Sequence, residues 1–232
     1  MNKKNYAVMD GNTAAAYSAY AFTEVAAIYP ITPSSPMAEK VDEWSAKGKK
    51  NLFGTTVDVI QMQSEAGAAG TCHGSLQAGA LTTTFTSSQG LMLMIPAMYA
   101  MGGQFLPSVM HIASRVVTSN HHSIFGDHTD FMTCRTTGYA MLMSSCPQEA
   151  MDLAESLGFA ATAAHVGERA QVIVDGIEET EDGAELIGHA WFQAPDSDGT
   201  VHLDASEASV GDILTVEFTD SFCYELIGHV VE

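Results

Sequence analysis

Short apolar runs separated by small-residue or amphipathic stretches fill the first 165 residues of the chain. The runs that predict strands lie at residues 25–28, 80–85, 107–113 and 138–143. Helices are predicted at residues 64–79 and 90–101, and Pro147 begins a further helix at a position that suits proline. Strands that alternate with helices are typical of an α/β fold with a doubly wound parallel sheet.

From residue 166 onward the pattern changes to strict alternation of apolar and polar side chains. The segments that predict strands there are residues 170–174, 185–190, 201–203, 213–218 and 224–231. Asp-Gly or Gly-Asp pairs at residues 182–183, 198–199 and 211–212 mark turns. Because closure removes exposed strand edges, these short strands predict a small five-stranded antiparallel OB-like β-barrel.

Composition changes at the same place as the pattern. All 13 methionines lie at or before Met151, and residues 1–165 have a net charge of −4. Residues 166–232 carry Arg169 as their one basic side chain against 16 acidic ones, a net charge of −15. We therefore predict two domains, residues 1–164 and residues 166–232.

The total charge and the cysteine content exclude several classes of protein. A net charge of −19 disfavours a nucleic-acid clamp and a polybasic membrane-surface protein, because both need many Lys and Arg side chains. No apolar stretch reaches the length that spans a membrane, and no apolar core follows the N-terminal lysines as in a signal peptide. Four scattered cysteines without a CxxC pair indicate reduced thiols and a cytoplasmic protein.

Three polar residues follow predicted strands or begin the next helix, where ligands bind in parallel sheets. Thr32 lies in a turn with three prolines, and either Ser34 or Ser35 is placed to cap the helix that follows. Arg115 directly follows an apolar strand and is suited to clamp a carboxylate. Glu65 near a helix start either interacts with the helix dipole or points at a ligand ring nitrogen. Together they suggest a site for a small carboxylate.

Other polar groups have simpler interpretations. Histidines 121, 122 and 128 lie near Asp127 and Asp130 but lack the spacing of a metal site, so loop polarity or a subunit contact is favoured and no metal site is predicted. Cys72 and His73 have no third partner in sequence, which favours core packing for both.

Five segments resemble the pyrimidine-binding domain of pyruvate:ferredoxin (flavodoxin) oxidoreductase over residues 6–162. They are MDGNTAA (9–15), YPITPSS (29–35), QSEAGA (63–68), TTTFTSSQG (82–90) and SIFGDH (123–128). That family converts pyruvate to acetyl-CoA and CO2 with thiamine diphosphate, magnesium and iron–sulfur clusters. The resemblance implies that Thr32 and Arg115 contact pyruvate. It also implies that Glu65 hydrogen-bonds the aminopyrimidine and promotes its imino tautomer.

The C-terminal segments resemble the TRAM barrel of the ribosomal-protein methylthiotransferases. They are GERAQVIVDG (167–176), QAPDSDG (193–199), VGDILTVEFTD (210–220) and YELIG (224–228). TRAM barrels often bind RNA, but the acidic charge of this one favours a basic protein partner. A passive barrel appended to another domain is the alternative.

Parts of both families are absent from this sequence. It has no diphosphate-and-magnesium motif, no iron–sulfur cysteine run and no radical CxxxCxxC segment. We therefore interpret the chain as portions of two enzymes joined in one frame. Residues 1–164 are expected to act only with complementary oxidoreductase domains or subunits and with ferredoxin or flavodoxin. The second hypothesis is a TRAM binding module that docks a basic ribosomal protein. A truncated sheet also predicts a homo-oligomer.

Overall fold

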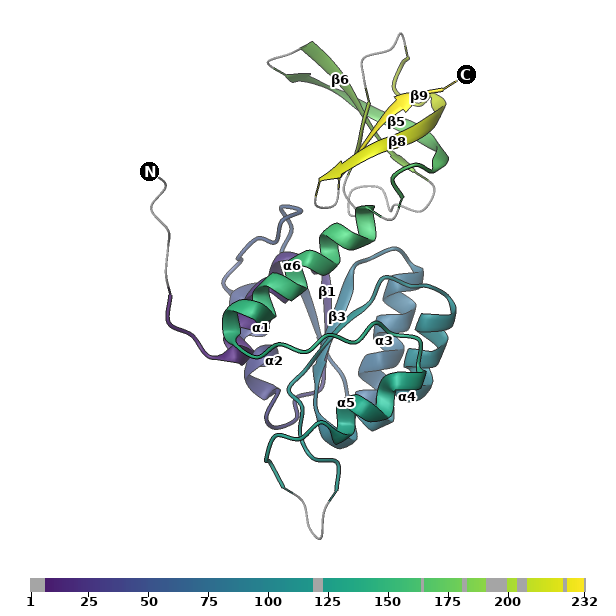
Figure 1. Cartoon of the computed structure of the whole chain (residues 1–232). Helices are drawn as coiled ribbons and strands as arrows, with labels where there is room; N and C mark the ends of the chain where they lie inside the picture. Colours follow the sequence, from purple (N-terminus) through teal and green to yellow (C-terminus); the bar gives the residue numbers. More distant parts are fainter. Residues whose placement is uncertain are drawn as a thin grey trace. The chain divides into compact units, whose positions relative to one another are not determined.

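The computed structural model describes residues 7–118, 123–163, 165–180, 183–190, 200–203, 208–222 and 225–231. The chain divides into two compact units, Met1–Ala154 and Glu155–Glu232 (Figure 1). No helix within these ranges is long and apolar enough to cross a membrane.

The first unit is built around four parallel strands. The strands are β1 (Val25–Ile28), β2 (Asp58–Gln61), β3 (Thr82–Thr86) and β4 (Val109–Ile112), in the order β2-β1-β3-β4. Its helices are α1 (Gly11–Ala21), α2 (Ser35–Ala46), α3 (Glu65–Gln77), α4 (Ser88–Gly103) and α5 (Thr129–Thr133). A further helix, α6 (Pro147–Ala163), begins in this unit and crosses the boundary to the second unit after Ala154. The chain leaves β1 toward β2 on one side and returns to β3 on the other, so the topological switch point lies between β1 and β3.

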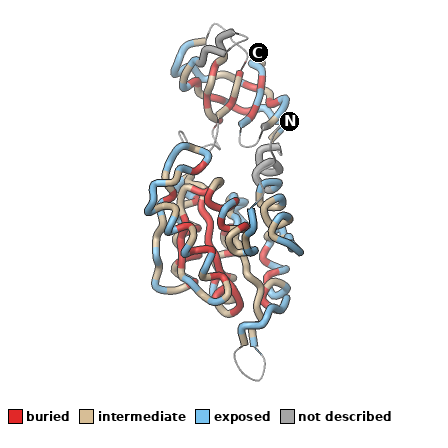
Figure 2. Tube along the Cα trace, turned by 90° about the vertical axis from the view of Figure 1, so that its left-hand side faces the viewer, coloured by how far each residue is buried: buried red, intermediate tan, exposed pale blue. Residues whose placement is uncertain are grey.

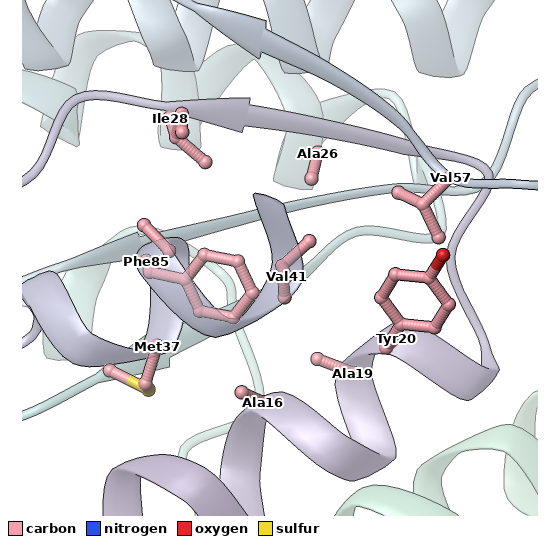
Figure 3. Close-up of a cluster of buried hydrophobic side chains, with 10 residues drawn as sticks. Ala16, Ala19, Tyr20, Ala26, Ile28, Met37, Val41, Val57 and Phe85 are labelled. Carbon is pink, nitrogen blue, oxygen red and sulfur yellow. The ribbon is translucent and has the colours of Figure 1, made fainter. Parts of the chain in front are cut away.

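Alternation along the strands divides the core between the two faces of this sheet. Ala26 and Ile28 pack with side chains of α1 and α2, whereas Ala27 packs with α3 and α4. Figure 1 shows the two pairs of helices beside the sheet. On the first face, Tyr20 and Phe85 fill much of the space between helices and strands (Figure 3). The predicted parallel α/β sheet with helices on both faces is confirmed.

Two local predictions for this unit were wrong. Residues 138–143 form no strand, because Tyr139 turns into the α3/α4 cluster and bonds Ser108 while Leu142 and Met143 are exposed. Ser34 does precede α2, but its hydroxyl donates to the carbonyl of Ile31 at 2.7 Å and makes no capping bond to a helix amide.

The second unit contains a closed barrel. Its strands are β5 (Arg169–Thr180), β6 (Gly183–Ala190), β7 (Val201–Leu203), β8 (Ile213–Phe222) and β9 (Glu225–Val230), in the order β5-β6-β7-β9-β8. Alternate side chains such as Val172, Phe218 and Leu226 fill its interior. Figure 2 shows buried positions interspersed with less buried ones along the barrel strands. The five strands were predicted, but the barrel is mixed and not antiparallel, because β7 and β9 are parallel. A closed ring with an odd number of strands must contain at least one parallel pair.

Candidate functional site

Polar side chains collect where the parallel strands end at the switch point. Thr32 lies in the turn after β1, Glu65 is the first residue of α3 after β2, and Arg115 follows β4 by three residues. Because parallel strands present their carboxyl ends at one edge of a sheet, these residues from distant parts of the sequence lie at the same edge.

Glu65 is held at the start of α3 and lies against α4. Ser64 caps α3 by accepting a hydrogen bond from the backbone N–H of Gly67 at 3.0 Å. The Glu65 side chain is buried, with 8% of the residue exposed. A Cβ added to Gly90 would lie 3.0 Å from Glu65 Oε1 and 2.6 Å from Thr86 Oγ1. The absence of a side chain at Gly90 therefore leaves room for both polar groups.

The Thr86 hydroxyl is an unusual feature of this space. Thr86 is fully buried, and its Oγ1 has no hydrogen-bond partner among the described residues. A buried hydroxyl without a partner costs free energy, and such groups commonly mark a place where a ligand or a water completes the hydrogen bonding. Glu65 and Thr86 thus place two buried polar groups side by side against Gly90.

Arg115 is fixed from two sides. Its Nη1 donates to the backbone carbonyl of Thr32 at 2.5 Å, and its Nη2 donates to the Gln89 Oε1 atom. The Arg115 Nε atom is buried without a partner in the described part of the chain. Thr32 and Arg115 are therefore brought together, although the contact uses the Thr32 carbonyl, and the Thr32 residue itself is exposed.

The first turn of α4 connects the two parts of the site. Gln89 contacts Arg115, and the next residue, Gly90, faces Glu65. Sequence reasoning did not identify Gln89, nor Ser88 and Asp130, which hold the same region through backbone hydrogen bonds. The polar residues that directly follow the strand predicted at residues 80–85 were the available signal for Ser88 and Gln89.

The histidine-rich segment gives no metal centre in the described residues. His121 and His122 lie outside the described ranges, and elsewhere no three His, Cys, Asp or Glu side chains gather to hold a metal ion. Asp127 accepts hydrogen bonds from the Thr129 hydroxyl and, at 2.6 Å, from the Thr129 backbone N–H. These two bonds, the hydroxyl bond first, hold the pKa of Asp127 below its ordinary value.

Cys72 and His73 face different environments. Cys72 is buried in the α3/α4 cluster, as predicted, and this burial raises the pKa of its thiol to about 12. A thiol with so high a pKa is a poor nucleophile near neutral pH. His73 is partly buried, and its Nε2 lies 2.6 Å from Gln104 Oε1.

Comparison with known proteins decides the family. The model of the family "pyruvate flavodoxin/ferredoxin oxidoreductase, thiamine diphosphate-binding" matches residues 17–181. The chain belongs to this family. The model of a second family, the TRAM domain, matches residues 166–231 of the same chain. The two resemblances seen in the sequence motifs, to the oxidoreductase domain and to a TRAM barrel, are thereby confirmed.

Curated relatives of this oxidoreductase family member are much longer. A pyruvate:ferredoxin oxidoreductase of Moorella thermoacetica is 66% identical over 146 residues, which are 63% of this chain and 12% of the relative. A pyruvate-flavodoxin oxidoreductase of Klebsiella pneumoniae is 65% identical over 145 residues, again 12% of the relative. The chain thus spans about an eighth of the length of these relatives.

A solved structure of a 2-oxoglutarate:ferredoxin oxidoreductase from Magnetococcus marinus is 26% identical. The matched region covers 48% of this chain and 18% of the chain from Magnetococcus marinus, with a TM-score of 0.42.

Proposed function

We propose that residues 1–164 form the pyrimidine side of a thiamine diphosphate site in an enzyme that oxidatively decarboxylates pyruvate to acetyl-CoA and CO2. The observation that carries the proposal is the buried Glu65 carboxyl beside Gly90 and the unpartnered Thr86 hydroxyl. A carboxyl and a hydroxyl can both hydrogen-bond the polar edge of a heteroaromatic ring, and the family assignment supports that ring being the cofactor's pyrimidine.

Each residue has a distinct role in this proposal. When bound, thiamine diphosphate supplies the nucleophilic carbon and the electron sink for decarboxylation. Glu65 holds a hydrogen bond to a ring nitrogen in a place with little water, where such a bond is strong. Arg115 binds the substrate carboxylate through its guanidinium, and Thr32 orients the substrate beside it. Burial by Gly90 and its neighbours limits access of water to Glu65.

The rest of the reaction is assigned to other domains. We propose that complementary domains or subunits supply the diphosphate-and-magnesium site and the iron–sulfur clusters, and that electrons pass to ferredoxin or flavodoxin. The names of the curated relatives support this choice of substrate and electron acceptor. The division at residues 164–166, a homo-oligomeric state and a cytoplasmic location stay predictions.

The test is complementation of a relative that lacks the matching segment. The full chain is mixed with the Moorella enzyme from which the 146 matched residues have been deleted, and pyruvate-dependent ferredoxin reduction is measured. We expect restored activity and its loss by at least about a hundredfold with Glu65→Ala. The exposed Glu39→Ala serves as control and should keep the activity. Equal activity of the Glu65→Ala and Glu39→Ala variants would contradict the proposal.

A second function is proposed for the barrel alone, the binding of a basic ribosomal protein. Its one arginine, Arg169, is paired with Glu217 at 2.7 Å, so the strongly acidic surface has little positive charge to offset it. A pull-down with purified basic ribosomal proteins tests this, with expected loss of binding at high salt. Binding that survives deletion of residues 166–232 would rule the function out.

A further inference from the structure

Asp130 is a buried carboxylate held only by backbone donors in the described residues. It is fully buried at 0% exposure, and no ion pair within the described ranges includes it. Its Oδ2 accepts from the backbone N–H groups of Ser88 at 2.8 Å and Arg115 at 2.9 Å, and its Oδ1 accepts from that of Phe131 at 2.6 Å. Charge-assisted bonds of this kind are stronger than those between neutral groups.

One oxygen atom of Asp130 therefore ties together two turns that border the switch point. Ser88 begins α4 directly after β3, and it adopts a positive φ of 49°. Arg115 follows β4. Because both N–H groups point at the same oxygen, the distance between the two turns is set by the carboxylate.

The guanidinium of Arg115 depends on the same two turns. The Ser88 hydroxyl donates to the carbonyl of Val116 at 2.7 Å, and the amide of Gln89 donates to that of Val117. Gln89 in turn accepts the hydrogen bond from Arg115 Nη2. Displacement of Ser88 relative to Arg115 would thus move the group that orients the guanidinium.

We propose that Asp130 is a positioning residue for carboxylate binding, which acts by fixing the backbone of Arg115 and the Ser88–Gln89 turn that orients its guanidinium. The inference rests on the proposed function for its ligand, a 2-oxo acid, but its first test needs no ligand. A residue that only stabilises the fold would lower the unfolding temperature without a selective effect on Arg115.

The matched variants are Asp130→Asn and Asp127→Asn. Both replace a carboxylate by an amide in the same segment, but Asp127 is exposed and bonds only Thr129 in the described residues. In Asp130→Asn, an amide NH2 must face at least one backbone N–H. If Asp130→Asn does not fold, Asp130→Ser retains one acceptor oxygen and is judged by the same readouts.

The first measurement is the ¹H–¹⁵N signal of the Arg115 side-chain Nε–H in the full chain without ligand, assigned by its absence from Arg115→Lys. We expect the exchange of this buried proton with water to accelerate by at least about tenfold in Asp130→Asn and to stay unchanged in Asp127→Asn. An equal rate in the wild type and in the Asp130 variant overturns the inference, whatever the ligand.

The second measurement is pyruvate affinity, from titration of the complemented enzyme described above. We expect Asp130→Asn to raise the pyruvate Kd by about tenfold and to have no further effect when Arg115→Ala is already present. Additive losses in the double variant would show that Asp130 does not act through Arg115 and would overturn the inference. The Arg115 Nε–H exchange rate could change in Asp130→Asn alone while the wild-type complemented enzyme does not bind pyruvate. That result would contradict the proposed function and leave the role of Asp130 standing.

Discussion

A single glycine lets α4 pack closely against the Glu65 side chain. Gly90 lies in the first turn of α4, and a Cβ there would be 2.8 Å from Glu65 Cγ as well as close to Thr86 Oγ1. Both neighbours are buried, so neither can move into solvent to relieve the clash. Any side chain at residue 90 therefore displaces the carboxyl or the hydroxyl from its present place.

We predict that Gly90→Ala destabilises the first unit by about 1–3 kcal/mol through overpacking and abolishes activity in the complementation assay. Urea unfolding and ferredoxin reduction measure the two effects. Gly70→Ala is the matched control, since a Cβ at this exposed position of α3 meets nothing within 4 Å. It should stabilise the helix by about 0.5–1 kcal/mol. Similar behaviour of the two variants would contradict the packing explanation.

The buried imidazole of His111 makes the stability of the first unit depend on pH. Its ring stacks on Phe85 at a centroid distance of 5.5 Å, and burial lowers its pKa from 6.5 to about 4. The folded state thus binds the proton less readily than the unfolded state. The stability that depends on a neutral imidazole is fully present above pH 6.5 and is lost as the pH falls toward 4.

We therefore predict that His111→Phe reduces the loss of unfolding free energy between pH 7 and pH 4.5 by up to about 3 kcal/mol. Urea titrations at the two pH values measure this difference. His73→Gln, which replaces a histidine of α3 that contacts Gln104, is the control for the loss of a histidine elsewhere in the unit. A wild-type pH dependence in His111→Phe would exclude the imidazole as its source.

At the scale of elements, close backbone contact holds the barrel strands together. A Cβ at Gly188 in β6 would lie 2.2 Å from the backbone oxygen of Ile173 in β5. A Cβ at Gly176 in β5 would instead meet only the Ile187 side chain, at 3.3 Å and beyond. Backbone cannot yield without breaking the ladder, whereas a side chain can change rotamer.

We predict that Gly188→Ala lowers the unfolding free energy of the barrel by about 3 kcal/mol and that Gly176→Ala lowers it by less than about 1 kcal/mol. Calorimetry of the full chain measures both, because the two compact units are expected to give separate transitions. An equal loss of unfolding free energy in the two variants would show that contact of the added Cβ with the backbone does not determine the destabilisation.

Elements with strong local patterns were predictable from the sequence, and those that depend on distant contacts were not. Val25–Ile28 is apolar, the β3 region is rich in β-branched threonine, and Pro147 marks a helix start. The segment at 138–143 has a similar local pattern, yet only the packing of Tyr139 on α3 and α4 decides its course. The place of Thr32, Glu65 and Arg115 at one edge of the sheet was predictable, because ligands bind at the carboxyl ends of parallel strands. The role of Asp130 was not predictable, because it requires two turns separated by more than 20 residues to meet.

At the scale of the whole molecule, charge is distributed very unevenly. Residues 166–232 have a net charge of −15, and Arg169 is already paired with Glu217. Repulsion among exposed carboxylates destabilises a small barrel, and salt screens it.

We predict that raising sodium chloride from 10 mM to 500 mM increases the unfolding temperature of the barrel by about 5 °C, which corresponds to about 1 kcal/mol for a domain of this size. The first unit, Met1–Ala154, has 8 basic and 11 acidic side chains, a net charge of −3, and its unfolding temperature should change much less. Calorimetry separates the two transitions, and the one lowered by Gly188→Ala identifies the barrel. A larger shift for the first unit would contradict this explanation.

The chain order of the candidate site has a consequence for synthesis of the protein. Every residue assigned to the site, from Thr32 to Asp130, precedes the barrel in the sequence. A ribosome adds about 5–20 residues per second, so translation from Asp130 to Ala190, the end of β6, takes about 3–12 seconds. The parallel sheet and its polar edge have this interval in which to assemble before the first barrel strands can pair.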